Sequence, residues 1–143
     1  MGRKAARRAL CPEKVRSISA MTTFKLSAMT VKQLVDRFVS LAIEQYQADI
    51  EDDIPRYSKL FKKMTLVESE LKSRPDDQRQ ALFHLYDHPN VEVRLMVAHA
   101  TLALAPVEAR QLLEDIAASK LFPQAGSAGM ALWALDDGIY KPT

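Results

Sequence analysis

The second half of this 143-residue chain contains an internal repeat. A shift of 31 residues gives six identities, at the position pairs 79/110, 80/111, 82/113, 100/131, 103/134 and 104/135. Each unit has the pattern of a helix, a breaker and a second helix, with the breakers at 87–90 and 119–123. A period near 31 residues is in the range of paired-helix solenoid repeats, whose units bury their apolar faces against each other. The repeat therefore predicts an all-α fold built from stacked helix pairs.

Two longer helices are predicted ahead of the repeat. Thr30 and Gln33 have the spacing of a capping box, and apolar residues recur at helical intervals from 31 to 46. The next helix follows the acidic stretch 49–53, where Asp52 or Asp53 can serve as its N-cap. It should end near residue 73, because Pro75 disfavours a helical conformation in the residue before it.

The helix predicted over 91–105 has apolar residues on two nearly opposite faces, separated by narrow polar seams. A helix with two apolar faces is packed on both, so we expect it between the preceding layer and the last repeat unit. Glu92 and His99 share one seam, and a contact with a neighbouring layer is a better interpretation of His99 than catalysis.

The last predicted helix begins near residue 125. Its first turns hold Ala125, Gly126, Ala128 and Gly129, whose small side chains allow another helix to approach closely. Gly138 is predicted to follow its end in the left-handed conformation that glycine adopts easily.

Residues 1–28 carry seven basic side chains against one acidic, a net charge of +6, whereas the whole chain carries +2. The remainder therefore carries about −4. We interpret 1–28 as a basic leader and 29–143 as the folded domain. The leader is either disordered or an upstream extension ahead of Met29, and it also has the composition of a transit peptide or of a segment that contacts nucleic acid or an anionic membrane. We expect the domain to keep its stability without it.

Several function classes find little support in the sequence. No apolar run approaches the ~18 residues needed to span a bilayer, so no membrane partner is expected. The single cysteine, Cys11, excludes an internal disulfide and favours a reducing, cytoplasmic location. His84 and His88 have a spacing that could hold zinc, but Pro89 follows at once and no third ligand is evident. We therefore predict no metal site, no cofactor, no catalytic residue and no enzymatic activity.

The segment from Asp87 to Arg94, in which Val93 and Arg94 follow a turn, resembles the helix-turn-helix of a HEAT-like repeat. From about Met29 to Pro142 the chain is similar to a family of small bacterial HEAT-like proteins described only as a domain of unknown function. The shared segments are 70–74, 87–90, 122–125 and 136–138. The resemblance implies an α-α superhelix of the HEAT or armadillo type with about five or six helices, and a binding role. It implies no reaction.

Five residues are candidates for contact with a partner. Glu51, Asp52 and Asp53 belong to the densest acidic run, which is either a solvated capping loop or a patch for a basic partner. Arg94 would either bridge to a carboxylate of the preceding turn or bind a ligand. Trp133 lies on the last helix, where it is either a core residue or, if exposed, an interaction hot spot.

The sequence thus predicts a non-catalytic protein-interaction module, for instance an adaptor or an immunity-type inhibitor of a basic effector. The alternative is a nucleic-acid-binding HEAT-like protein that uses the dense basic run within 59–74, which the negative charge of the folded part disfavours. A basic groove would favour nucleic acid. A cleft with two or more titratable groups of shifted pKa would favour an enzyme. The sequence does not indicate an oligomeric state.

Overall fold

The computed structural model describes residues 25–143, and its regular elements are helices. They are α3 (Val31–Ile50), α4 (Ile54–Ser73), the 3-10 helix η1 (Gln78–Leu85), α5 (Val91–Thr101), α6 (Pro106–Ala118) and α7 (Gln124–Asp136). The predicted all-α class is confirmed. None of the described helices is long and apolar enough to cross a membrane.

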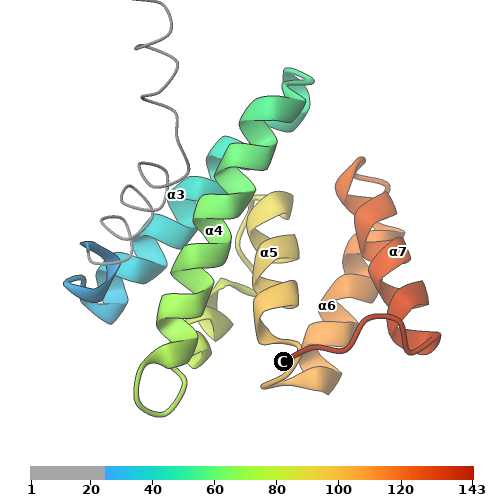
Figure 1. Ribbon diagram of the computed structural model, residues 1–143. Helices are drawn as coiled ribbons and strands as arrows, with labels where there is room; N and C mark the ends of the chain where they lie inside the picture. Colours follow the sequence, from blue (N-terminus) through green and yellow to red (C-terminus); the bar gives the residue numbers. More distant parts are fainter. Residues whose placement is uncertain (1–24) are drawn as a thin grey trace, which may run out of the picture.

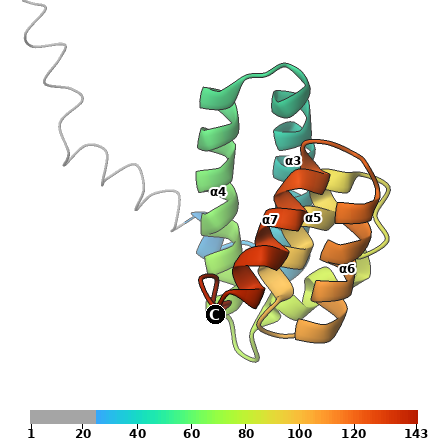
Figure 2. The same ribbon diagram turned by 90° about the vertical axis from the view of Figure 1, so that its right-hand side faces the viewer.

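The central element of the fold is α5. α3 and α4 form an antiparallel hairpin on one side of it, and α6 and α7 form a second hairpin on the other side (Figures 1 and 2). Every α5 residue is buried except Arg94 and His99. This confirms the prediction that the helix is packed on both faces, because only a helix enclosed by two layers buries nearly its whole surface.

The helix ends follow the local signals in the sequence. Gln33 N donates to Thr30 Oγ1 at 3.1 Å and Thr30 N donates to Gln33 Oε1 at 2.8 Å, so the predicted capping box is formed. Asp53 is the N-cap of α4, and its Oδ1 accepts from Arg56 N at 3.1 Å. α4 ends at Ser73, as predicted.

Two elements differ from the prediction. The helix before the first breaker is a 3-10 helix, and its N-cap Asp77 has a left-handed φ of 49°. Asp77 Oδ1 accepts from the backbone and side chain of Arg79, which holds the chain in this tight turn. α5 ends at Thr101 and not at Ala105, because Pro106 already opens α6 and the intervening residues form a turn.

The small residues of α7 act differently from the prediction. Ala125 and Ala128 are buried, with exposed fractions of 4% and 0%. A Cβ placed on Gly126 would lie 3.9 Å from Phe122, and one placed on Gly129 would meet nothing within 4 Å. The alanines therefore face the neighbouring helices, and the interpretation of these two glycines as contact residues was wrong.

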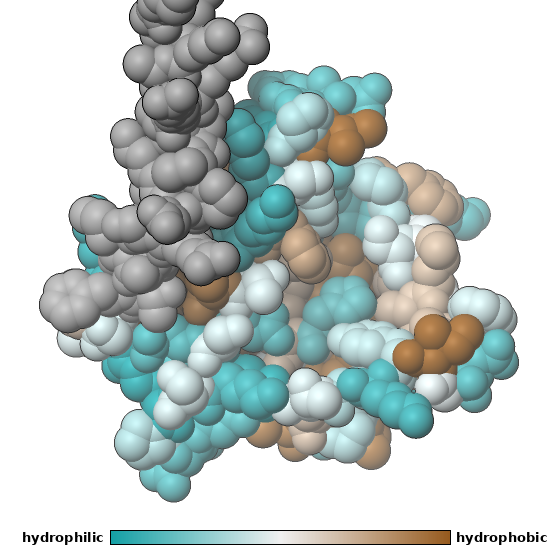
Figure 3. All heavy atoms as spheres, viewed as in Figure 1, coloured by the Kyte–Doolittle hydropathy of each residue, from teal (hydrophilic) through white to brown (hydrophobic). Residues whose placement is uncertain are grey.

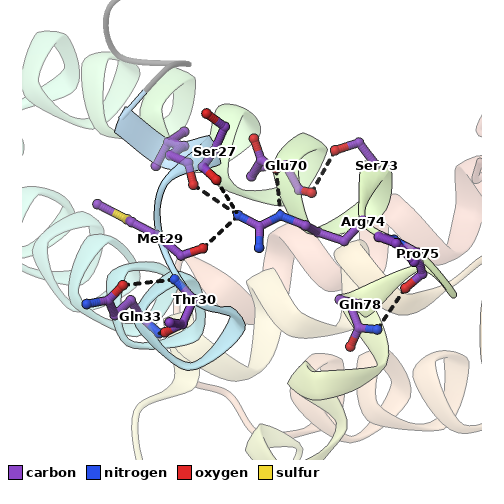
Figure 4. A network of polar contacts seen from close by, with 10 residues as sticks. Ser27, Met29, Thr30, Gln33, Glu70, Ser73, Arg74, Pro75 and Gln78 are labelled. Atoms are coloured by element: carbon purple, nitrogen blue, oxygen red, sulfur yellow. Dashed lines mark hydrogen bonds and ion pairs between the residues drawn. The ribbon is translucent and has the colours of Figure 1, made fainter.

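The folded region begins before the predicted boundary at Met29. Leu26 is 5% exposed and belongs to the hydrophobic core. Arg74 Nη2 donates to the carbonyl oxygens of Leu26, Ser27 and Met29, and Arg74 Nε pairs with Glu70 Oε2 at 2.8 Å (Figure 4). Removal of residues 1–28 would break the contacts made by Leu26 and Ser27 and would leave those of Arg74 with Met29 and Glu70. The rest of the predicted leader, residues 1–24, lies outside the described residues.

Candidate functional site

A carboxylate is buried at the centre of the fold. Glu92, in the first turn of α5, is 1% exposed. Its Oε2 accepts hydrogen bonds from Gln45 Nε2 at 2.7 Å and Tyr57 Oη at 2.8 Å, and its Oε1 accepts one from Gln124 Nε2 at 3.0 Å. These donors come from α3, α4 and α7, so Glu92 joins three helices to α5. We refer to Gln45, Asp49, Tyr57, Glu92 and Gln124 as the Glu92 cluster.

Asp49 is the second carboxylate of the Glu92 cluster. Its Oδ2 accepts from Gln124 Nε2 at 3.1 Å, so one amide nitrogen bonds to both acids. Burial, together with repulsion from Glu92, raises the pKa of Asp49 to about 6. The same two causes raise the pKa of the Tyr57 phenol. In residues 25–143 no lysine or arginine forms an ion pair with either carboxylate, so neutral donors alone solvate them.

Most of the Glu92 cluster was not foreseen from the sequence. The sequence places Glu92 on a polar seam of its helix together with His99, but it does not single out Gln45, Tyr57 or Gln124 as its partners. Gln45 is fully buried and its Oε1 has no hydrogen-bond partner. A charged residue inside a helix packed on both faces was the available signal, since such a charge needs buried polar partners.

A groove opens between α4 and α7, with α5 as its floor, and we call it the α4–α7 groove. It contains a pocket of about 320 Å³, seen as the hollow near the centre of Figure 3. From α4 the pocket is lined by Tyr57, Phe61, Thr65 and Glu68, whose spacings of three or four residues place them in one stripe along the helix. Tyr57 also belongs to the Glu92 cluster and therefore connects the groove to it.

The floor and the far wall of the groove come from distant parts of the chain. Leu95, Met96 and His99 of α5 form the floor, while Ser127 of α7 and Tyr140 of the C-terminal segment form the far wall. A second hollow of about 280 Å³ shares His99 and Tyr140 and extends the groove toward the C-terminus. The groove is thus one concave surface built from three helices and the chain end.

Besides Tyr57, three further titratable side chains with shifted pKa values line the groove pocket. Burial lowers the pKa of His99 and raises the pKa values of Tyr140 and Glu68, the latter against the opposing effect of Arg79 and Lys72. His99 Nδ1 lies 3.3 Å from Tyr140 Oη. The groove therefore meets the criterion that was set for an enzyme. Among the described residues Glu68 and His99 share no hydrogen bond, and the titratable side chain within hydrogen-bond distance of His99 is Tyr140.

The predicted acidic run lies beside the groove. Asp52 and Asp53 line a small hollow of about 120 Å³ together with Tyr57, which also lines the groove pocket. Asp53 caps α4, and Glu51 Oε2 pairs with Arg56 Nη1 at 3.2 Å. Glu51 and Asp53 thus have local structural partners, in agreement with the capping-loop interpretation, and the side chains of Glu51 and Asp52 are exposed at the end of the groove.

Arg94 and Trp133 lie outside the lining of the groove pocket. Arg94 Nη1 donates to the carbonyl oxygen of His88 at 2.6 Å. It stabilises the turn as predicted, but its acceptor is a backbone carbonyl, and among the described residues it forms no ion pair with Asp87. Trp133 is 59% exposed, so the core interpretation is wrong and the surface interpretation stands. Met130, one turn earlier on α7, is 72% exposed.

One member of the histidine pair considered for zinc, His88, stabilises the same turn. His88 Nδ1 accepts from Asn90 N at 3.0 Å. Within residues 25–143 no group of three or more His, Cys, Asp or Glu side chains is placed to hold a metal ion.

Comparisons with known proteins cover the folded region. A family model described as "Domain of unknown function (DUF2019)" matches residues 32–136. The crystal structure of the protein RPA1889 from Rhodopseudomonas palustris CGA009 is similar to this chain, with 49% sequence identity and a TM-score of 0.80. The match covers 82% of this chain and 98% of that one. No curated protein matches the chain.

Proposed function

Since the chain belongs to the DUF2019 family, a domain of unknown function, we propose from its own geometry that it is a non-catalytic module that binds another protein in the α4–α7 groove. The supporting observation is the groove itself. Its α4 wall includes Phe61, which is 47% exposed, and outside the groove lining α7 also exposes Met130 and Trp133. An exposed aromatic ring on the wall of a concave surface is typical of protein-binding sites.

The charge at one end of the groove favours a basic partner. The acidic run 51–53 lies at that end and Glu68 lies in the groove pocket, whereas Lys72, Arg79 and Lys141 line the hollow toward the C-terminus. Nucleic acid is the second candidate, supported by the exposed Lys59, Lys62 and Lys63 of α4. At 100° per residue these lysines lie on the side of α4 away from the groove stripe, so a phosphate backbone would have to bind a convex surface.

A binding role explains the groove without a reaction. Glu68 and His99 are not paired, and His99 instead contacts Tyr140, with ring centroids 5.9 Å apart. A general base needs an orienting partner or a nucleophile within hydrogen-bond reach, and neither is present beside Glu68 in the described residues. We propose further that the two hairpins stack as HEAT-like layers of a superhelix and that the protein acts in the bacterial cytoplasm.

Co-purification with groove variants tests the proposal. The wild-type chain, Phe61→Ser and Ile43→Ser would each be used to capture partners from a bacterial lysate. Ile43 is the matched control, because it is 44% exposed on α3 and lines none of the hollows described above. We expect one or more proteins that bind the wild type and Ile43→Ser but are lost with Phe61→Ser.

Two results would contradict the proposal. A captured protein that is retained equally by all three chains binds a different surface. The second result is tight, steeply salt-dependent binding of random duplex DNA that Phe61→Ser does not affect. It would favour nucleic-acid binding over protein binding as the function.

A further inference from the structure

Glu68 is an acid without a partner inside the α4–α7 groove. Its side chain is partly buried, and it forms no hydrogen bond or ion pair with another described residue. Lys72 follows one turn later on α4 but is not within ion-pair distance. Arg79 is already bound by both carboxylate oxygens of Asp77, at 2.9 and 2.7 Å, and by Ala100 O. The carboxylate of Glu68 therefore has its acceptor capacity free for a ligand.

Aromatic rings surround the same pocket. Tyr57 and Phe61 of α4 are stacked, with ring centroids 6.5 Å apart and an interplanar angle of 18°. Tyr140 contributes a third ring from the opposite wall. A cation placed against an aromatic face is attracted by the ring quadrupole, and a nearby carboxylate adds to that attraction.

The floor of the pocket is mostly apolar. Met64, Leu95 and Met96 line it beside His99, and methionine adapts its shape to flexible ligands. A volume of about 320 Å³ suits one long side chain and not a folded element. An apolar floor beneath a carboxylate and three rings matches a side chain with an aliphatic stem and a cationic head.

We propose that this pocket binds an arginine side chain of a partner protein. The guanidinium lies between Glu68 and Tyr140, where it forms hydrogen bonds with the carboxylate and stacks on the Tyr140 ring, and the stem lies on Met64 and Met96. Arginine fits better than lysine, because its planar head both stacks on rings and binds a carboxylate with two hydrogen bonds. The inference rests on the proposed function and names the chemistry of the partner at that site.

Titration of the full chain with a short peptide tests this pocket. The probe is the capped tripeptide acetyl-Ala-Arg-Ala-amide, and the control probe carries citrulline, which has the shape of arginine without its charge. Binding is followed through the backbone amide resonances by NMR. We expect shifts at Glu68, His99 and Tyr140 with an affinity on the order of millimolar for arginine, and none for citrulline.

Variants of the two neighbouring charges sharpen the test. Glu68→Gln should weaken arginine binding about tenfold or more, whereas Lys72→Met should leave it unchanged or strengthen it, because it removes a competing cation. Three results would each overturn the inference. The first is equal affinity for the arginine and citrulline peptides, and the second is an arginine affinity of Glu68→Gln equal to that of the wild type. The third is amide resonance shifts confined to the acidic run 51–53. If the captured partner is lost with Phe61→Ser but retained with Glu68→Gln, the groove function stands and the arginine assignment falls.

The basic leader of this chain is another source of arginine. In a variant with Arg3, Arg7, Arg8 and Arg16 replaced by glutamine, we expect an unchanged tripeptide affinity, because the pocket is free for a partner. A clear gain in affinity would mean that the leader competes for the pocket, and it would contradict our choice of a separate protein.

Discussion

Buried carboxylates usually need a cation, but Glu92 is held by neutral groups. Two glutamine amides and one phenol donate to its oxygens. Such donors replace the lost hydration of a buried acid, and each must be fixed in place by a packed helix. This arrangement destabilises the charged form of Asp49, because its carboxylate shares the Gln124 amide and lies close to Glu92. The pKa of Asp49 is raised for that reason.

Asp49→Asn should stabilise the protein above pH 6 and have little effect near pH 4. The folded pKa of about 6 exceeds the ordinary aspartate pKa of 3.8, so the native state binds more protons between these values and stability falls as the pH rises through them. Asparagine removes the charge and keeps an oxygen for Gln124. Thermal unfolding at pH 4 and pH 7.5 measures the effect, with Asp36→Asn on the exposed side of α3 as the control. A stabilisation of equal size at both pH values would contradict a titration effect.

Leu102→Ala should reduce the free energy of unfolding by about 2 to 5 kcal/mol. Leu102 is 3% exposed and follows directly after α5, which is enclosed on both faces, so the cavity left by the substitution is shielded from solvent. Denaturant melts measure the loss. Leu121→Ala is the control, because Leu121 is 48% exposed and its truncation leaves no buried cavity. A loss of less than about 1 kcal/mol for Leu102→Ala would indicate that the end of α5 can relax.

At the scale of the helices, local signals were predictable and long-range ones were not. The Thr30 capping box, the Asp53 cap and the end of α4 before Pro75 depend on residues within one or two turns, so the sequence suffices to predict them. The 3-10 form of η1 depends on Asp77 holding Arg79, which in turn donates to Ala100 O twenty-one residues away. Contacts of that kind become visible only when the helices are placed in space.

The same distinction applies to the candidate site. The acidic run was found because neighbouring charges are visible in the sequence. The groove was not, because Glu68, His99 and Tyr140 are separated by tens of residues and none of them is unusual in its own segment. Gln45 and Gln124 lie in helices whose apolar faces dominate the sequence pattern, so only their common contact with Glu92 reveals them.

A chain that begins at Met29 should be less stable than one that begins at Lys25. The shorter chain lacks the buried side chain of Leu26 and two of the three carbonyl oxygens that Arg74 binds. We expect a loss of about 1 to 3 kcal/mol in the free energy of unfolding, measured by denaturant melts of the two chains. Equal denaturation midpoints for the two chains would show that the contacts of Leu26 and Ser27 do not stabilise the domain, and the folded domain would then begin at Met29 as predicted.

At the scale of the whole molecule, the densest acidic run and the three lysines of α4 lie on different surfaces. The acidic run 51–53 lies at one end of the groove and Lys72, Arg79 and Lys141 line its other end, while Lys59, Lys62 and Lys63 lie on the other side of α4. A basic partner that approaches the groove is attracted by the run before it makes short-range contacts. Clustered charge of this kind acts mainly on the rate of association.

Neutralisation of the acidic run should therefore slow association more than it speeds dissociation. The variant carries Glu51→Gln, Asp52→Asn and Asp53→Asn. Asparagine keeps the N-cap at position 53 and tolerates the left-handed φ of 54° at position 52, so α4 should remain intact. Association and dissociation rates with the captured partner, measured from low to physiological ionic strength, test the prediction, and the wild-type rate should fall as the Debye length shortens to ~8 Å.

The matched control for this variant is the lysine surface of α4. Replacement of Lys59, Lys62 and Lys63 by glutamine changes the net charge by the same amount in the opposite sense, and we expect it to leave the association rate unchanged or to raise it. If only the total charge mattered, the two variants would shift the rate by similar amounts in opposite directions. An effect much larger for the acidic variant locates the steering at the end of the groove, whereas an association rate insensitive to salt in the wild type would assign the interface to the apolar surface around Trp133.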